Sequence, residues 1–278
     1  MSDRQYSEAL QPLFQLSAES ADPYELDAHN FLEMGITTEH IPELTELILD
    51  EKYYLSEDLG YPQFFAYQAL GQLKTESAID ALVAGTRRWG DSDWFEWFTE
   101  AMPKIFSQIG CSTIPSVVKL LQDATASVEN RTRALTYLEE IGINNLECRD
   151  QCIAVLTEEL WKFNSNDPTL NGFMVAGLVS DLKAVDAAPA IEAAYAADRV
   201  DESIVGDWYD AQVYLGLISA ADVPKRERSW SRHSISLQLS GSESDGFMPS
   251  ADKKFDPQKA KAKKKQQKQA RKQNRRKK

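Results

Sequence analysis

One apolar pattern recurs along this chain and restricts the fold that the chain can adopt. In five stretches, apolar residues stand at positions i, i+3, i+4 and i+7, the spacing that places them on one face of an α-helix. The stretches begin at Ala66, Met102, Ala134, Val175 and Ala211, so the offsets are 36, 32, 41 and 36 residues. A near-constant period of this length predicts similar helical units, each of which buries its stripe against its neighbours.

A second helix is expected after each of the first four stripes. Proline suits the first turn of a helix, because the N–H that it lacks would have no partner there. The prolines expected to mark the second helices are Pro42, Pro115, Pro189 and Pro224. Ser112 and Asp186 stand three residues before two of these prolines and suit N-cap positions. We therefore predict an all-α fold, a right-handed α-α superhelix of about five helical hairpins.

The repeating unit resembles a known family. A two-helix unit of 32 to 41 residues, with an apolar stripe, a short turn and a proline-led second helix, resembles HEAT-type (armadillo-like) repeats. Residues 173–189 and 205–217 are also similar to uncharacterised bacterial HEAT-like proteins that often carry a C-terminal, Cys-rich SEC-C module. No cysteine follows Cys152, so that module is absent here. The resemblance implies a HEAT-like α-solenoid and assigns no catalytic residue.

Composition divides the chain into four parts. Residues 1–23 form an N-terminal segment, 24–224 the predicted solenoid, 225–252 a flexible Ser-rich linker and 253–278 a basic tail. The tail carries a charge of +13 and the rest of the chain carries −25. We expect the tail to bind a polyanion such as RNA or the ribosome through phosphate contacts. The residues expected to make these contacts are Lys259, Lys261, Lys263, Lys264, Lys265, Lys268, Arg271, Lys272, Arg275, Arg276, Lys277 and Lys278. Two alternatives stay open: a passive solubility tail, and a tail that docks on its own acidic body.

Two acidic-aromatic clusters are candidates for binding a protein partner on the acidic solenoid surface. Tryptophan and tyrosine are common anchors at interfaces, and acidic neighbours favour a basic partner. The residues selected are Trp94, Trp97, Asp207, Trp208, Tyr209 and Asp210. The alternative is that Trp97 and Trp208 only fill gaps between helical units.

The cysteines and histidines do not form a recognisable metal or catalytic motif. Three cysteines are too few for a disulfide framework, which predicts a reducing, cytoplasmic location. Cys111 is expected to be structural, and Cys148 and Cys152 are expected to pack in the core from one helix face. The N-terminus shows no secretory signal, and no window is apolar enough to span a membrane. We expect no catalytic residue, cofactor or metal.

These observations favour a non-catalytic scaffold or adaptor that is a monomer or a weak oligomer. The resemblance suggests one alternative, because some HEAT-type proteins attach bilin chromophores to antenna proteins. A bilin lyase, or a chaperone-like factor acting on a protein client, is therefore the second hypothesis. Recruitment of the basic tail to an anionic membrane surface is the third.

Overall fold

The part of the chain that the structure describes is entirely helical. The computed structural model describes residues 6–16, 26, 28–55, 61–91 and 99–224, and no strand occurs within these ranges. All of them belong to the first of two units, residues 1–226, whereas the second unit, residues 227–278, lies outside the described ranges. The predicted all-α class is confirmed for the described residues. None of their helices has the length and apolar content needed to cross a membrane.

The helices are short, as the sequence period requires. Their bounds are α1 Gln11–Gln15, α2 Ile41–Leu49, α3 Glu51–Leu55, α4 Tyr61–Leu73, α5 Glu76–Trp89, α6 Met102–Ile109, α7 Ile114–Gln122, α8 Val128–Asn144, α9 Arg149–Leu160, α10 Pro168–Ala176, α11 Ala188–Ala196, α12 Glu202–Val205 and α13 Trp208–Tyr214. A π-helical segment, Gly177–Asp181, continues α10. The 3-10 turns are Glu8–Leu10, Thr38–His40, Cys111–Thr113, Leu146–Cys148, Val185–Ala187 and Ala220–Asp222.

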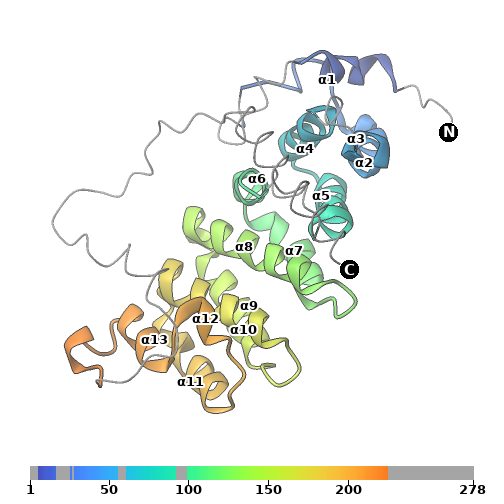
Figure 1. Cartoon of the computed structure of the whole chain (residues 1–278). Coiled ribbons are helices and arrows are strands. Elements are labelled where there is room, and N and C mark those ends of the chain that lie inside the picture. Colours follow the sequence, from blue (N-terminus) through green and yellow to red (C-terminus); the bar gives the residue numbers. More distant parts are fainter. Residues whose placement is uncertain (1–5, 17–25, 27, 56–60, 92–98, 225–278) are drawn as a thin grey trace, which may run out of the picture. The chain divides into compact units, whose positions relative to one another are not determined.

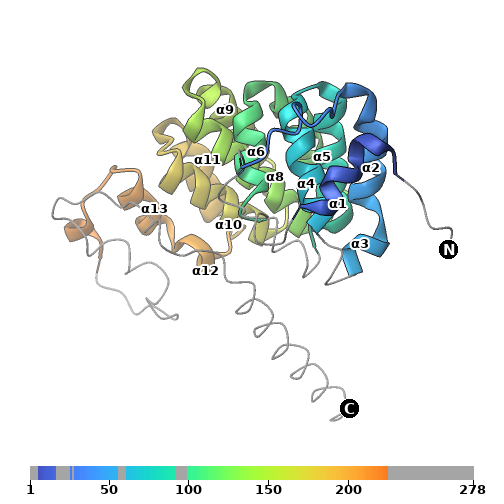
Figure 2. The same cartoon turned by 90° about the horizontal axis from the view of Figure 1, so that it is seen from above.

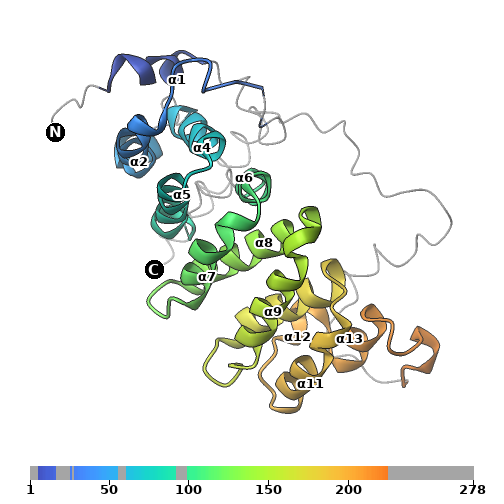
Figure 3. The same ribbon diagram turned by 180° about the vertical axis from the view of Figure 1, so that it is seen from behind.

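Helices that are close in sequence lie side by side, as the colours from blue to orange show (Figure 1). One row contains α4, α6, α8 and α10, in which each helix contacts the next. The other row contains α2, α5, α7, α9 and α11, again with contacts between successive members. Helices of the two rows pack on each other in the pairs α4–α5, α7–α8 and α8–α9, which Figures 2 and 3 show from two further directions.

The predicted stripes form the core between these rows. The first stripe lies on α4, the second on α6 and the third on α8, and the fourth runs from α10 into the π-helical segment. All four positions of the third and fourth stripes are buried. The fifth stripe begins on α13, but α13 ends at Tyr214, so Leu215 and Ile218 follow the helix. Only the 3-10 turn Ala220–Asp222 comes after it within the described residues.

Proline marks the second helices as predicted, but the predicted N-caps are wrong. Pro42, Pro115 and Pro189 each stand at the second position of their helix, whereas Pro224 is the last described residue. Ser112 and Asp186 lie inside 3-10 turns, and neither α7 nor α11 has a side-chain cap. The tighter turn already pairs backbone N–H groups with carbonyls three residues back, which replaces the side-chain cap.

The N-terminal segment also contributes to the core. Leu10 and Leu13, from the 3-10 turn and α1, are fully buried, and α1 contacts α4. Two side-chain bonds attach this segment to its surroundings. The Tyr6 hydroxyl donates to Asp50 at 3.2 Å, and the Ser7 hydroxyl donates to Glu43 at 2.5 Å. The packed helical unit therefore starts before residue 24.

Side chains of one helical unit donate hydrogen bonds to backbone carbonyls at the helix ends of the preceding unit. The last carbonyls of a helix have no partner within it. The Gln63 amide on α4 donates to the carbonyl of Leu47 at the end of α2, over 3.1 Å. The Asn130 amide on α8 donates to the carbonyl of Arg87 on α5, over 3.0 Å. Several bonds of this kind join residues 33 to 43 positions apart in the sequence, about one period of the pattern.

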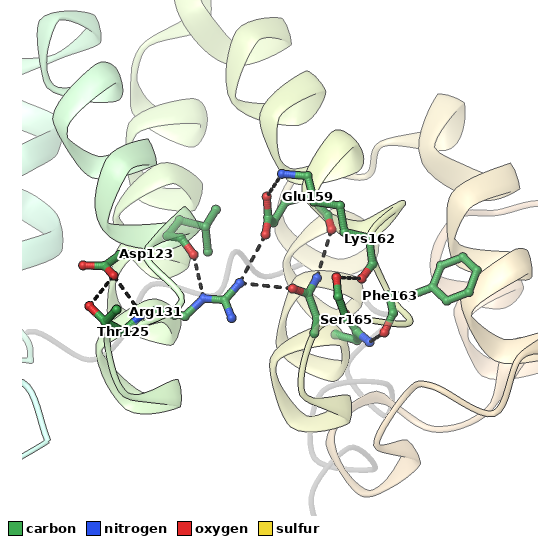
Figure 4. A network of polar contacts seen from close by, with 10 residues as sticks. Asp123, Thr125, Arg131, Glu159, Lys162, Phe163 and Ser165 are labelled. Carbon is green, nitrogen blue, oxygen red and sulfur yellow. Dashed lines mark hydrogen bonds and ion pairs between the residues drawn. The ribbon is translucent and has the colours of Figure 1, made fainter.

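A buried polar network joins the end of α9 to α8 and to the loop before α10 (Figure 4). Arg131 donates to the Leu121 carbonyl at 2.6 Å, to the Glu159 carboxylate at 3.2 Å and to the Asn166 amide oxygen at 3.1 Å. The Asn166 amide donates in turn to the Glu159 carbonyl at 3.0 Å. The Glu159 side chain is only 3% exposed, so its charge is balanced inside the protein, mainly by Arg131 and Lys162.

The cysteine predictions require a correction. Cys111 and Cys148 form a disulfide with their Cα atoms 5.8 Å apart, so they are not two independent thiols. Cys148 lies in the 3-10 turn before α9, whereas Cys152 lies within α9 and remains a free, buried thiol. The sequence separation of 37 residues is about one period, and packing of successive units brings the two turns together. Because disulfides persist mainly in oxidising compartments, the cysteine count no longer supports a cytoplasmic location.

We predict that Glu159→Ala lowers the free energy of unfolding by about 3–5 kcal/mol, because it leaves the buried Arg131 guanidinium without its anion. The matched control is Arg87→Ala, which removes an ion pair with Asp123 whose side chains are 44% and 30% exposed. That variant should lose far less stability, because solvent screens an exposed ion pair. Urea denaturation of both variants checks the difference, and equal losses would contradict a structural role for the buried network.

Candidate protein-binding surface

The structure places four of the six predicted protein-binding residues at the start of α13. The Asp207 carboxylate accepts from the backbone N–H groups of Tyr209 at 2.9 Å and Asp210 at 3.2 Å. The Asp210 carboxylate accepts from the N–H of Asp207 at 3.2 Å, which completes a capping box. Both carboxylates therefore start a helix, and this role explains their spacing without a ligand.

The aromatic residues of this cluster differ in exposure. Trp208 is partly buried against the core, with its ring 6.2 Å from that of Tyr195. The Tyr195 hydroxyl donates to the Gly206 carbonyl at 2.9 Å, which fixes the turn before α13. Tyr209 is 41% exposed. Binding of a partner by this cluster stays a prediction, with Tyr209 as its exposed aromatic residue.

The other predicted site residues lie outside the described ranges. Trp94 and Trp97 fall within residues 92–98, and the basic residues of the tail fall within residues 225–278. Their proposed roles remain predictions from sequence. Across the residues that the structure does describe, no group of three His, Cys, Asp or Glu side chains is arranged to hold a metal ion.

A second candidate binding surface lies at the turns that join the two rows of helices. Leu146 is 76% exposed in the 3-10 turn before α9, and Val185 is 48% exposed in the corresponding turn before α11. Ile143, at the end of α8, is 39% exposed. The two turns are neighbours, because the Arg149 guanidinium donates to the Leu182 carbonyl. Exposed apolar groups on adjacent turns are typical of surfaces that bind another molecule.

Acidic side chains surround these apolar residues. Glu147 and Asp186 are exposed within the same two turns, and Asp181 is exposed at the end of the π-helical segment. Glu139 lies one helical turn before Ile143 on α8. We call this surface the acidic-apolar edge. Its residues are Glu139, Ile143, Leu146, Glu147, Asp181, Val185 and Asp186.

Glu139 is the carboxylate of this edge with the largest displacement of its pKa. Burial raises its pKa well above the usual value, and the nearby charges of Asp181 and Glu140 raise it further. Its carboxylate lies against the π-helical segment, where a Cβ added to Gly177 would stand 1.6 Å from the Glu139 Oε1. Glycine at 177 therefore leaves the space that the Glu139 carboxylate occupies, and a side chain at this position would displace that carboxylate.

The π-helical segment contacts Glu139 and contributes to the acidic-apolar edge. The Leu182 N–H donates to the Gly177 carbonyl, five residues back, at 3.0 Å. Segments of this kind are rare and are often found at functional sites. Burial also raises the pKa of Asp181, the last residue of the segment. Two carboxyl groups whose charged forms are both disfavoured thus lie next to exposed apolar residues, an arrangement suited to a cation on an apolar stem.

The sequence contains a signal for this edge. Leu146 and Val185 are apolar residues just before second helices, 39 positions apart, and so occupy corresponding places in successive units. Only the fold shows that both side chains are exposed. Comparison with protein-family models, with curated proteins and with solved structures found no match to this chain.

We predict that Glu139→Gln stabilises the protein at neutral pH. A carboxyl group with a raised pKa in the folded state destabilises that state when it ionises, so stability falls as pH rises from the unfolded-state pKa of about 4.3 towards the folded-state value. The gain in Tm over the unaltered chain should therefore be small near pH 4.5 and grow towards pH 7.5. Glu158→Gln, which removes an exposed carboxylate from α9, is the control, and a pH-independent gain would contradict the assignment.

Proposed function

We propose that this protein is a non-catalytic scaffold, a HEAT-like right-handed α-solenoid that binds a protein partner and a polyanion. The two rows of short helices and the bonds one period apart support the solenoid architecture. In such an architecture each unit presents the same turns along one side, which creates an extended binding surface. We propose a monomer or weak oligomer as its state.

The observation that carries the proposed protein binding is the acidic-apolar edge. Two of its exposed apolar residues, Leu146 and Val185, come from corresponding turns of two successive units, and each turn also carries an exposed acidic residue. A partner that fits this surface presents apolar side chains together with lysine or arginine. The apolar groups contribute burial, and the opposite charges guide association.

The proposed polyanion binding rests on the charge of residues 253–278. Fourteen basic residues and one acidic residue make this segment strongly attractive to phosphate groups. Aromatic residues are absent after Phe255, so stacking on bases does not contribute. The segment is therefore proposed to recognise RNA or the ribosome by charge and not by base sequence. The described residues contain no feature that specifically favours the bilin lyase or chaperone alternative.

The edge is tested by the double variant Leu146→Ser, Val185→Ser. A partner recovered from nuclease-treated lysate with the unaltered chain should bind this variant about 30- to 900-fold more weakly, because each of the two anchors contributes about 1–2 kcal/mol. The control is Trp161→Ser, which removes a side chain that is 52% exposed just past the opposite end of α9. Equal binding by the double variant and the unaltered chain would exclude the edge as the contact surface.

The tail is tested by replacing its lysines with glutamine in the full chain. Electrophoretic mobility of a labelled single-stranded RNA should shift with the unaltered chain, and affinity should fall steeply with salt, with a slope of about −0.7 per phosphate contact on a double-logarithmic plot. Replacement by arginine keeps the charge and should keep binding. If the glutamine variant binds as well as the arginine variant, the tail does not bind RNA.

A further inference from the structure

The Cys111–Cys148 disulfide joins corresponding turns of two successive helical units. Cys111 opens the 3-10 turn before α7, and Cys148 closes the 3-10 turn before α9. The second turn also carries Leu146, the most exposed apolar residue of the acidic-apolar edge. The state of this bond therefore acts directly on the turn that we propose as a binding surface.

The two sulfur atoms have different surroundings. Cys111 is partly buried and Cys148 is 4% exposed, so Cys111 is the more accessible of the two residues. Cys148 is also the N-cap residue of α9, a helix of 12 residues, and is followed by Arg149. Burial disfavours a Cys148 thiolate, whereas a helix N-terminus and a neighbouring cation favour it. Cys111 is thus the sulfur more open to attack, and Cys148 is the leaving sulfur, which takes up a proton once it is released.

Both cysteines have acceptors ready for the reduced form. The Cys111 Sγ lies 3.6 Å from the Glu147 carboxylate, and the Cys148 Sγ lies 3.6 Å from the Asn145 carbonyl. Disulfide sulfurs carry no hydrogen, so these two contacts become hydrogen bonds only once thiols are present. Each sulfur therefore has an acceptor nearby for the S–H group that reduction creates.

The turns remain connected when the disulfide is open. The Asn145 side-chain amide donates to the Ser107 carbonyl at 3.1 Å and to the Ile141 carbonyl at 3.1 Å. It thereby links the end of α6 to the end of α8 beside the disulfide. Reduction can then loosen the edge without unfolding the protein. Cys152 does not interfere, because burial raises its pKa to about 11 and keeps it a neutral thiol.

We propose that the Cys111–Cys148 disulfide is a reversible redox switch that sets the rigidity of the acidic-apolar edge. The thiolate of a small thiol such as glutathione attacks the Cys111 Sγ, the Sγ–Sγ bond breaks, and Cys148 leaves as a thiolate that takes a proton from water. A second thiolate then attacks the mixed disulfide, which releases Cys111 and oxidised glutathione. Two electrons pass from two glutathione molecules to the protein.

The first experiment is a time course of reduction in the folded full-length chain. After incubation with millimolar reduced glutathione and acid quenching, alkylation and mass spectrometry measure the free thiols at each cysteine. Cys111 and Cys148 should become alkylated together while far-ultraviolet circular dichroism stays unchanged and Tm falls by about 5–15 °C. Absence of the 111–148 cross-linked peptide in a non-reduced digest, or reduction only of the unfolded chain, would overturn the proposal.

Amide hydrogen exchange shows which segments become less rigid when the disulfide is reduced. On reduction, exchange should accelerate in residues 107–113 and 143–149 and stay unchanged in α2 and α4, which lie in the units before Cys111. Uniform acceleration across all these segments would show that the bond supports global stability and does not act as a local switch. Cys148→Ser should reproduce the reduced pattern without any reductant.

A separate experiment tests which of the two sulfur atoms is attacked. Glu147 places a negative charge beside Cys111 and repels the anionic glutathione, so Glu147→Gln should accelerate reduction by up to about five-fold. Glu158→Gln removes the same charge from an exposed position near the other end of α9 and serves as the control, with an unchanged rate. An unchanged rate for Glu147→Gln would contradict attack at Cys111.

Discussion

The structure depends on side chains of one helical unit that satisfy the backbone carbonyls of its neighbour. A short helix leaves its last carbonyls without partners, and a chain of short helices repeats this problem in every unit. Gln63, Asn130 and Arg131 solve it by donating from the first helix of a unit to helix ends beside it. Because these donors are largely buried, each bond both fixes the spacing of adjacent units and removes an unsatisfied polar group.

At the acidic-apolar edge the neighbouring charges disfavour the ionised form of a buried carboxyl group, in contrast to the charges around Glu159. Buried Glu159 has cations on two sides, whereas the charges that act on Glu139 come from Asp181 and Glu140 and have the same sign as its own. Ionisation of Glu139 therefore destabilises the folded chain on its own. Carboxyl groups with a raised pKa are common at ligand-binding sites, because a bound cation then supplies the opposite charge that the protein lacks.

The disulfide connects these two features. It crosses between successive units, as the polar bonds do, and it ends in the turn that carries Leu146. Asn145 makes a non-covalent link between the same turns, so the covalent bond is an addition to an already connected edge. A proposed scaffold whose binding surface lies on such turns can thus change its local rigidity while the packing of its core is kept.

The sequence by itself determined the helical class, the period of the units and most of the core, because a stripe of apolar residues at helical spacing has few ways to be buried. It also placed the starts of three second helices through Pro42, Pro115 and Pro189. Tertiary structure alone decided which apolar residues face outward and which cysteines are paired. Both depend on residues about a full period apart, and the distance between such residues is set by how successive units pack and not by any local pattern.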